Sequence, residues 1–102
     1  MTPLTTLYSG MILHRPSLGS PEARETIKFV DVMWAEPYRR ENNYGTMILH
    51  SSGEFRFYRE RYADVHTHIC QFVGRLVKQG HRPEMLPTFP WATGPVRQDP
   101  SK

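Results

Sequence analysis

Residues 44–80, with the sequence YGTMILHSSGEFRFYRERYADVHTHICQFVGRLVKQG, decide the fold that we predict for this chain. Residues 46–50 and 55–59 are rich in β-branched, aromatic and large apolar side chains, and a short turn at residues 51–54 joins them into a hairpin. After the hairpin, apolar residues recur at the spacing of one helical face: Val65, Ile69, Phe72, Val73, Leu76 and Val77. The stretch therefore predicts a hairpin followed by one long amphipathic helix that packs on a sheet.

The expected helix has recognisable ends. Asp64 can cap the N-terminus or lie in the first turn, where a carboxylate suits the positive end of the helix dipole. Arg75 and Lys78 fall in the last turns, and Gly80 with Pro83 close behind is a C-terminal stop signal.

The N-terminal half gives weaker signals. Residues 4–14 alternate like a strand that is interrupted at Gly10. Residues 21–34 have two interpretations, a helix throughout or a short helical turn followed by a strand over 26–34, and we favour the second because β-branched and aromatic residues crowd this segment. Glu36-Pro37 is expected to end that strand, and residues 38–45 to form a polar loop.

From Pro83 onward, proline recurs among apolar residues, which predicts an extended tail. The fold class expected is α+β, with a small antiparallel sheet of three or four strands, one long amphipathic helix on one face, and a Pro-rich C-terminal tail. We assign residues 1–95 to a single domain and expect residues 96–102 to be disordered.

Composition narrows the class of protein. The chain has 102 residues, of which 38% are hydrophobic, and a net charge of +3, which permits nucleic-acid binding without requiring it. Cys70 is the only cysteine, so no intrachain disulfide can form. The N-terminus does not resemble a signal peptide, and no apolar run is long enough to span a membrane. We expect a soluble, cytoplasmic protein with no membrane partner.

The densest group of reactive side chains lies at residues 64–70. On a helix, His66 and Cys70 are neighbours, but a structural zinc site needs four ligands at recognised spacings, and a mid-helix thiol lacks the helix N-terminus that would lower its pKa. A ribonuclease could use His50 or His81 with Arg56 or Arg59, but nothing in the sequence fixes such a geometry. We expect no catalytic residues, no metal and no cofactor, and keep a small ribonuclease or metal-binding protein as the third hypothesis.

A surplus of aromatic residues outside the helix favours a protein-binding module, because aromatic residues and arginine dominate protein interfaces. Small proteins of this kind are often accessory regulators or inhibitors from phages and mobile elements that occupy a host protein, and we adopt that class as the expectation. A second copy of the chain, packed on the uncovered sheet face, is a further candidate partner. The partner-binding residues expected are Trp34, Tyr38, Arg39, Arg40, Tyr44, Phe89 and Trp91.

The alternative hypothesis is nucleic-acid binding. Residues 55–62 interleave basic and aromatic side chains, which on an exposed strand would offer stacking and phosphate contacts together. The residues expected to bind nucleic acid in that case are Arg39, Arg40, Arg56, Tyr58, Arg59, Arg61, Arg75, Lys78 and Arg82.

Overall fold

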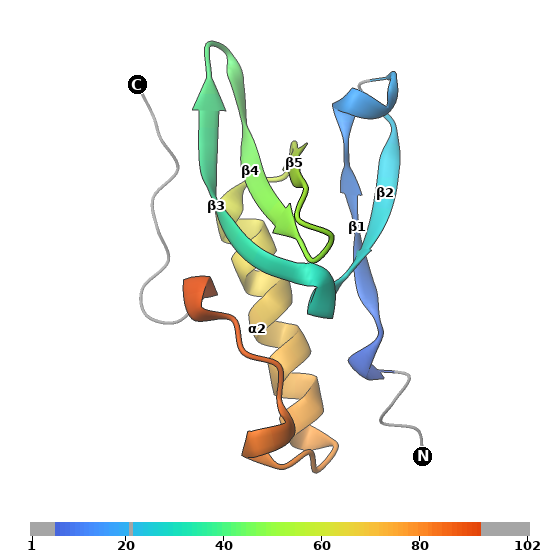
Figure 1. Cartoon of the computed structure of the whole chain (residues 1–102), viewed down its shortest axis with the longest axis vertical. Helices are drawn as coiled ribbons and strands as arrows, with labels where there is room; N and C mark the ends of the chain where they lie inside the picture. Colours follow the sequence, from blue (N-terminus) through green and yellow to red (C-terminus); the bar gives the residue numbers. More distant parts are fainter. Residues whose placement is uncertain (1–5, 21, 93–102) are drawn as a thin grey trace.

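The structure is a computed structural model that describes residues 6–20 and 22–92, without the side chains of Arg40 and Asn43 (Figure 1). Its main elements are β1 (Gly10–His14), β2 (Arg24–Lys28), β3 (Val32–Arg40), β4 (Asn43–His50), β5 (Phe55–Tyr58) and α2 (Tyr62–Lys78). The expected α+β class, with antiparallel strands and one long helix, is confirmed.

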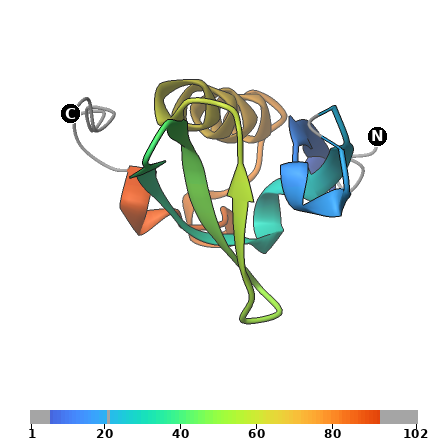
Figure 2. The same ribbon diagram turned by 90° about the horizontal axis from the view of Figure 1, so that it is seen from above.

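The strands form two antiparallel sheets. One sheet is the β1–β2 hairpin, and the other has three strands in the order β3-β4-β5. The backbone N–H of Arg59 donates to the carbonyl oxygen of His14 (2.9 Å), which ties the end of β5 to the end of β1. Figure 2 shows α2 along one side of the three-stranded sheet, and we call the opposite side of that sheet its outer face.

The expected strand over residues 26–34 is wrong in detail. A 3-10 turn at Phe29–Asp31 divides it, so that β2 ends at Lys28 and β3 begins at Val32. The helical alternative for residues 21–34 is also wrong, because the described residues of this segment outside that short turn lie in strands, in a turn at Glu22 or in irregular structure at Ala23. The strand expected over residues 4–14 is shorter, since β1 begins only at Gly10, and residues 4 and 5 lie outside the described part.

The predicted ending at Pro37 and the predicted loop over 38–45 are corrected as well. β3 continues through Pro37 to Arg40, and Glu41 and Asn42 alone make the turn into β4. Pro37 is tolerated because β3 is an edge strand, where a missing N–H need not interrupt the hydrogen-bond ladder. Glu41 takes a left-handed conformation (φ 55°), as tight hairpin turns require.

Helix α2 begins and ends as local signals dictate. Arg61 precedes the first helical residue and Asp64 lies in the first turn, so Asp64 is not the cap. At the other end Gly80 has φ 89°, and its N–H donates to the carbonyl of Val77 (3.0 Å) while the N–H of His81 donates to that of Leu76 (3.2 Å). This left-handed glycine ending confirms the predicted stop.

The core lies between α2 and the inner face of the three-stranded sheet. The sheet contributes four fully buried residues, Ala35, Thr46, Ile48 and Tyr58. The buried face of α2 consists of Tyr62, Val65, His66, Ile69, Phe72 and Leu76. Four of the six apolar helix positions expected from spacing are buried, whereas Val73 is half-buried and Val77 is 56% exposed.

Residues 83–92, which we call the tail, fold back on the same domain. Phe89 and Trp91 are 7% and 4% exposed, and the hydroxyl of Tyr62 donates to the carbonyl oxygen of Trp91 (3.0 Å). The ring of Phe89 meets those of Phe72 and Trp91 edge to face. The tail is extended between two 3-10 turns, at Pro83–Met85 and Pro90–Ala92. The predicted disorder of residues 96–102 lies outside the described residues.

Candidate functional site

The outer face of the three-stranded sheet carries the clearest candidate site. Strand pairing places Trp34, Leu49 and Phe55 in one row across the sheet. Met47 and Phe57 share the next row with Glu36, and Tyr38 pairs with Gly45 in the third. Because the buried residues alternate with these along each strand, these side chains point away from α2. We call Trp34, Tyr38, Met47, Leu49, Phe55 and Phe57 the outer apolar patch.

A β-bulge places Trp34 in this patch. Val32 pairs with His50 and Trp34 pairs with Leu49, so Met33 is one extra residue in β3. Without the bulge, Val32 and Trp34 would lie on the same face of the strand. The bulge therefore allows Val32 to enter the core while Trp34 turns outward, and Met33 itself is exposed.

Contacts within the outer apolar patch fix its shape. The rings of Tyr38 and Phe57 meet edge to face at 5.6 Å, across the position of Gly45, which has no side chain to separate them. The indole N–H of Trp34 donates to a carboxylate oxygen of Glu36 (3.1 Å). Phe55 is 64% exposed and the other five residues of the patch are half-buried. Part of each aromatic or aliphatic surface is thus open to a ligand.

The composition of this face is unusual for a sheet surface in water. The free face of an antiparallel sheet normally carries polar residues that alternate with the buried ones. Here Glu36 is the only charged side chain among the described residues of the three rows. Contiguous apolar surfaces of this kind mark contact sites for other macromolecules.

The predicted partner-binding residues are divided by the structure. Trp34 and Tyr38 lie in the outer apolar patch. Arg39 and Tyr44 pair across the β3–β4 hairpin on the opposite face, with the guanidinium 5.1 Å from the ring centroid. Arg40 ends β3, and its side chain lies outside the described part. Phe89 and Trp91 are core residues, so we withdraw them from the contact surface.

Sequence reasoning missed four members of the site, which are Met47, Leu49, Phe55 and Phe57. The alternation of β4 and β5 contains the signal, because each strand carries apolar residues on both faces. That signal becomes readable only when the position of α2 is known, since the helix defines which face is inner.

The basic and aromatic surface expected for nucleic acid is not assembled on β5. Arg56 and Tyr58 point to the inner side, where Arg56 forms ion pairs of 2.7 Å with both Glu25 and Glu54. The Tyr58 hydroxyl donates to Glu25 (3.0 Å), and Arg15 pairs with the same carboxylate (2.8 Å). The β5 arginine is thus used to join the two sheets.

Electrostatic effects follow from this network. The hydrogen bond between Arg56 and Glu54 lowers the pKa of the glutamate and raises the pKa of the arginine. Burial raises the pKa of Tyr58 above its ordinary value. The three pKa shifts favour an ionised Glu54, a charged Arg56 and a protonated Tyr58, which are the forms that make these contacts at neutral pH.

Five further residues predicted to bind nucleic acid are exposed but separated. Arg59 and Arg61 lie just before α2, whereas Arg75, Lys78 and Arg82 lie at its other end. The helix between the two groups has 17 residues, which corresponds to a length of about 25 Å. They do not form one patch with the aromatic residues.

The residues considered for catalysis have structural contacts. The Nδ1 atom of His50 accepts the backbone N–H of Ser52 (3.0 Å) at the β4–β5 turn. His81 Nδ1 lies 3.1 Å from the carbonyl oxygen of Leu76 at the end of α2. Within the described part, no three His, Cys, Asp or Glu side chains gather as metal ligands.

His66 and Cys70 form a close pair on α2. The Nδ1 atom of His66 lies 3.6 Å from the sulfur of Cys70, and its Nε2 atom lies 3.0 Å from the carbonyl oxygen of Ala92. A groove of about 600 Å³ opens beside Cys70, between α2 and the tail. We call it the α2–tail groove.

Comparison with known proteins identifies no family: no family model, no curated protein and no solved structure matches this chain. In the part of the chain that the structure describes, no helix has the length and apolar character needed to cross a bilayer.

Proposed function

We propose that this chain is a small, non-enzymatic protein-binding module that docks the outer apolar patch against an apolar surface of another protein. The observation that carries the proposal is the concentration of six apolar or aromatic residues on a sheet face away from α2, with Glu36 as the only described charge. Trp and Tyr, the residue types most enriched among interface hot spots, both occur in the patch.

The outer face is smaller than a standard protein interface. The three strands have nine, eight and four residues, so the outer face covers about 340 Å² at roughly 3.4 Å per residue and 4.8 Å between strands. A standard interface buries about 800 Å² on each partner. The partner therefore has to extend beyond the patch, and Met33, the exposed extra residue of the β-bulge, is an adjoining surface.

Occupation of a partner is the mode of action that this surface supports, because binding through it needs no reactive group. An accessory regulator or inhibitor acts in this way, and we retain that class for the protein. The single cysteine, which leaves the fold independent of disulfides, supports a cytoplasmic location.

Two variants test the proposal with a matched control. Phe55→Glu places a charge in the outer apolar patch, and Ile12→Glu places the same charge on β1; the two positions are 64% and 63% exposed. Tagged protein is used to capture partners from lysate after nuclease treatment, at low and high salt. We expect a discrete protein to be retained by the wild type and by Ile12→Glu.

The Phe55→Glu variant should lose about tenfold or more in recovery, because an unpaired charge in an apolar contact costs more than 1.4 kcal/mol. Equal recovery with both variants would reject the patch as the contact surface. Recovery that disappears with nuclease or high salt would instead favour nucleic acid. Light scattering of the purified protein separates self-association, in which a second copy is the partner, from binding to a different protein.

A further inference from the structure

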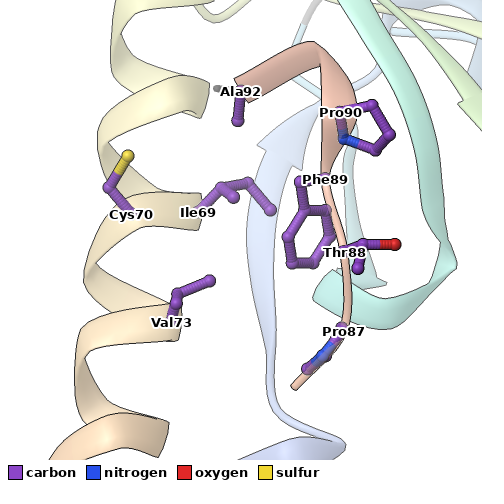
Figure 3. Close-up of a pocket in the computed structure, with 8 residues that line it drawn as sticks. All are labelled: Ile69, Cys70, Val73, Pro87, Thr88, Phe89, Pro90 and Ala92. Carbon is purple, nitrogen blue, oxygen red and sulfur yellow. The ribbon is translucent and has the colours of Figure 1, made fainter. Parts of the chain in front are cut away.

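The α2–tail groove has almost entirely hydrocarbon walls. Ile69 and Val73 of α2 form one wall, and Figure 3 shows both side chains directed toward the ring of Phe89 in the tail. Pro87, Pro90 and Ala92 complete the tail side. The groove measures about 600 Å³, and its polar side chains are those of Cys70 and Thr88.

The tail wall is held in place by two bonds from α2. Tyr62 donates its hydroxyl to the Trp91 carbonyl, and the ring of His66 meets the Ala92 carbonyl through Nε2. A carbonyl oxygen can only accept, so Nε2 of His66 carries the hydrogen, and in the neutral ring Nδ1 then has a lone pair. That lone pair faces the exposed thiol of Cys70 at 3.6 Å.

This arrangement contains the parts of an activated nucleophile. Cys70 supplies the sulfur, His66 the base, and the Ala92 carbonyl orients the base. Cys70 lies in the middle of the helix, away from its N-terminus, but Nδ1 of His66 lies close enough to its sulfur to serve as a general base. The sequence alone placed His66 and Cys70 as neighbours but gave neither the orientation of the ring nor the groove beside it.

We propose that Cys70 is an S-acylation site, at which a fatty acyl group forms a thioester and lays its hydrocarbon chain in the α2–tail groove. The donor is a long-chain acyl thioester such as an acyl-coenzyme A. His66 Nδ1 takes the proton of the Cys70 thiol while the sulfur attacks the carbonyl carbon. The bond between that carbon and the donor sulfur breaks, and His66 returns the proton to the leaving thiolate.

The lining selects this ligand over a polar one. Apolar contacts with Ile69, Val73 and Phe89 stabilise a bound chain of methylene groups. A polar ligand would instead lose its hydrogen bonds to water without replacement. Transfer of one methylene group from water into such surroundings favours binding by about fourfold. Acylation should therefore accelerate with chain length until the groove is filled.

The test uses the purified full chain with acetyl-, octanoyl- and palmitoyl-coenzyme A. Intact mass reports the added group, and release by hydroxylamine identifies a thioester. We expect the octanoyl and palmitoyl donors to react at least tenfold faster than the acetyl donor, with one group added. Cys70→Ala should remove the addition, and His66→Gln should slow it at least tenfold, because glutamine can still donate to the Ala92 carbonyl but is not a base.

A matched pair of variants tests the groove itself. Val73→Glu places a charge in the wall of the groove, and Val77→Glu places one on the exposed side of the same helix. Val73→Glu should abolish the preference for long chains, and Val77→Glu should retain it. Circular dichroism is used to check that both variants are folded.

Three outcomes would overturn the proposal. Equal rates with all three donors would show an ordinary surface thiol. Equal chain preference in the two valine variants would show that the α2–tail groove does not hold the acyl chain. Binding of the acyl chain without a thioester would exclude the covalent step. The inference is independent of the outer apolar patch, so Phe55→Glu should acylate as the wild type does.

Discussion

Trp91 gives the sharpest test of how the C-terminal segment is used. Its side chain is 4% exposed and its ring packs edge to face on those of Tyr62, His66 and Phe89. Truncation of a buried Trp to Ala typically costs about 3–5 kcal/mol, because the lost contacts are compounded by the cavity that remains. A domain is stable by only about 5–15 kcal/mol, so Trp91→Ala should remove a large part of the total.

The assay is urea unfolding followed by circular dichroism, with linear extrapolation to water. Met85→Ala is the matched control, because Met85 lies in the same tail but is exposed, and we expect it to change the free energy of unfolding by less than about 0.5 kcal/mol. Tyr62→Phe keeps the ring and removes only the hydroxyl that donates to the Trp91 carbonyl. It should cost about 1–3 kcal/mol, since that buried oxygen loses its partner.

A change of less than about 1 kcal/mol in Trp91→Ala would refute the reasoning. It would mean that the tail does not contribute to the core in solution. Phe89 and Trp91 would then return as candidate anchors for a partner, as their sequence context first indicated.

The remaining predictions concern the network between the two sheets. Glu25→Gln should lower the free energy of unfolding by about 1–3 kcal/mol, because Arg15 and Arg56 lose the charge of their shared, largely buried partner. In the same urea assay Arg82→Ala, which removes an exposed ion pair of 3.9 Å, should have almost no effect. The raised pKa of Tyr58 means that the folded state keeps a proton that the unfolded chain loses above its ordinary pKa of 10.0. Its contribution to stability is therefore complete below about pH 10 and is lost as the pH rises further, and Tyr58→Phe should show a smaller decline between about pH 9 and pH 11.

Local signals account for the parts of the fold that were predicted correctly. The α2 stripe and the glycine at its C-terminal end depend only on near neighbours in the sequence. The same holds for the turn between β4 and β5, where Gly53 takes the left-handed conformation. These elements would be recognisable in any tertiary context.

Errors arose where a residue's role depends on distant segments. Pro37 was expected to end a strand, but on an edge strand it is accommodated, and no local pattern reveals which strand is the edge. The extra residue Met33 was equally unreadable, because a bulge is defined by the partner strand. The requirement for glycine at position 10 also depends on a distant segment, since an added Cβ would collide with the carbonyl of Ile27 on the neighbouring strand.

The candidate site was predicted in part for the same reason. Trp34 and Tyr38 were identified as surplus aromatic residues, and both lie in the outer apolar patch. The same argument selected Phe89 and Trp91, which the tail carries into the core. Apolar residues in a Pro-rich segment are suited equally to the chain's own core and to a partner, and only the tertiary structure distinguishes the two.

The central claim is that the outer apolar patch contacts another protein, and site-specific photocrosslinking tests it most directly. A photoreactive phenylalanine analogue replaces Phe55 in one protein and Ile12 in another, and each is irradiated in lysate before and after nuclease treatment. The account predicts a discrete, nuclease-resistant crosslinked protein from position 55 and none from position 12. A crosslink from position 12 alone, or none from position 55, would contradict it.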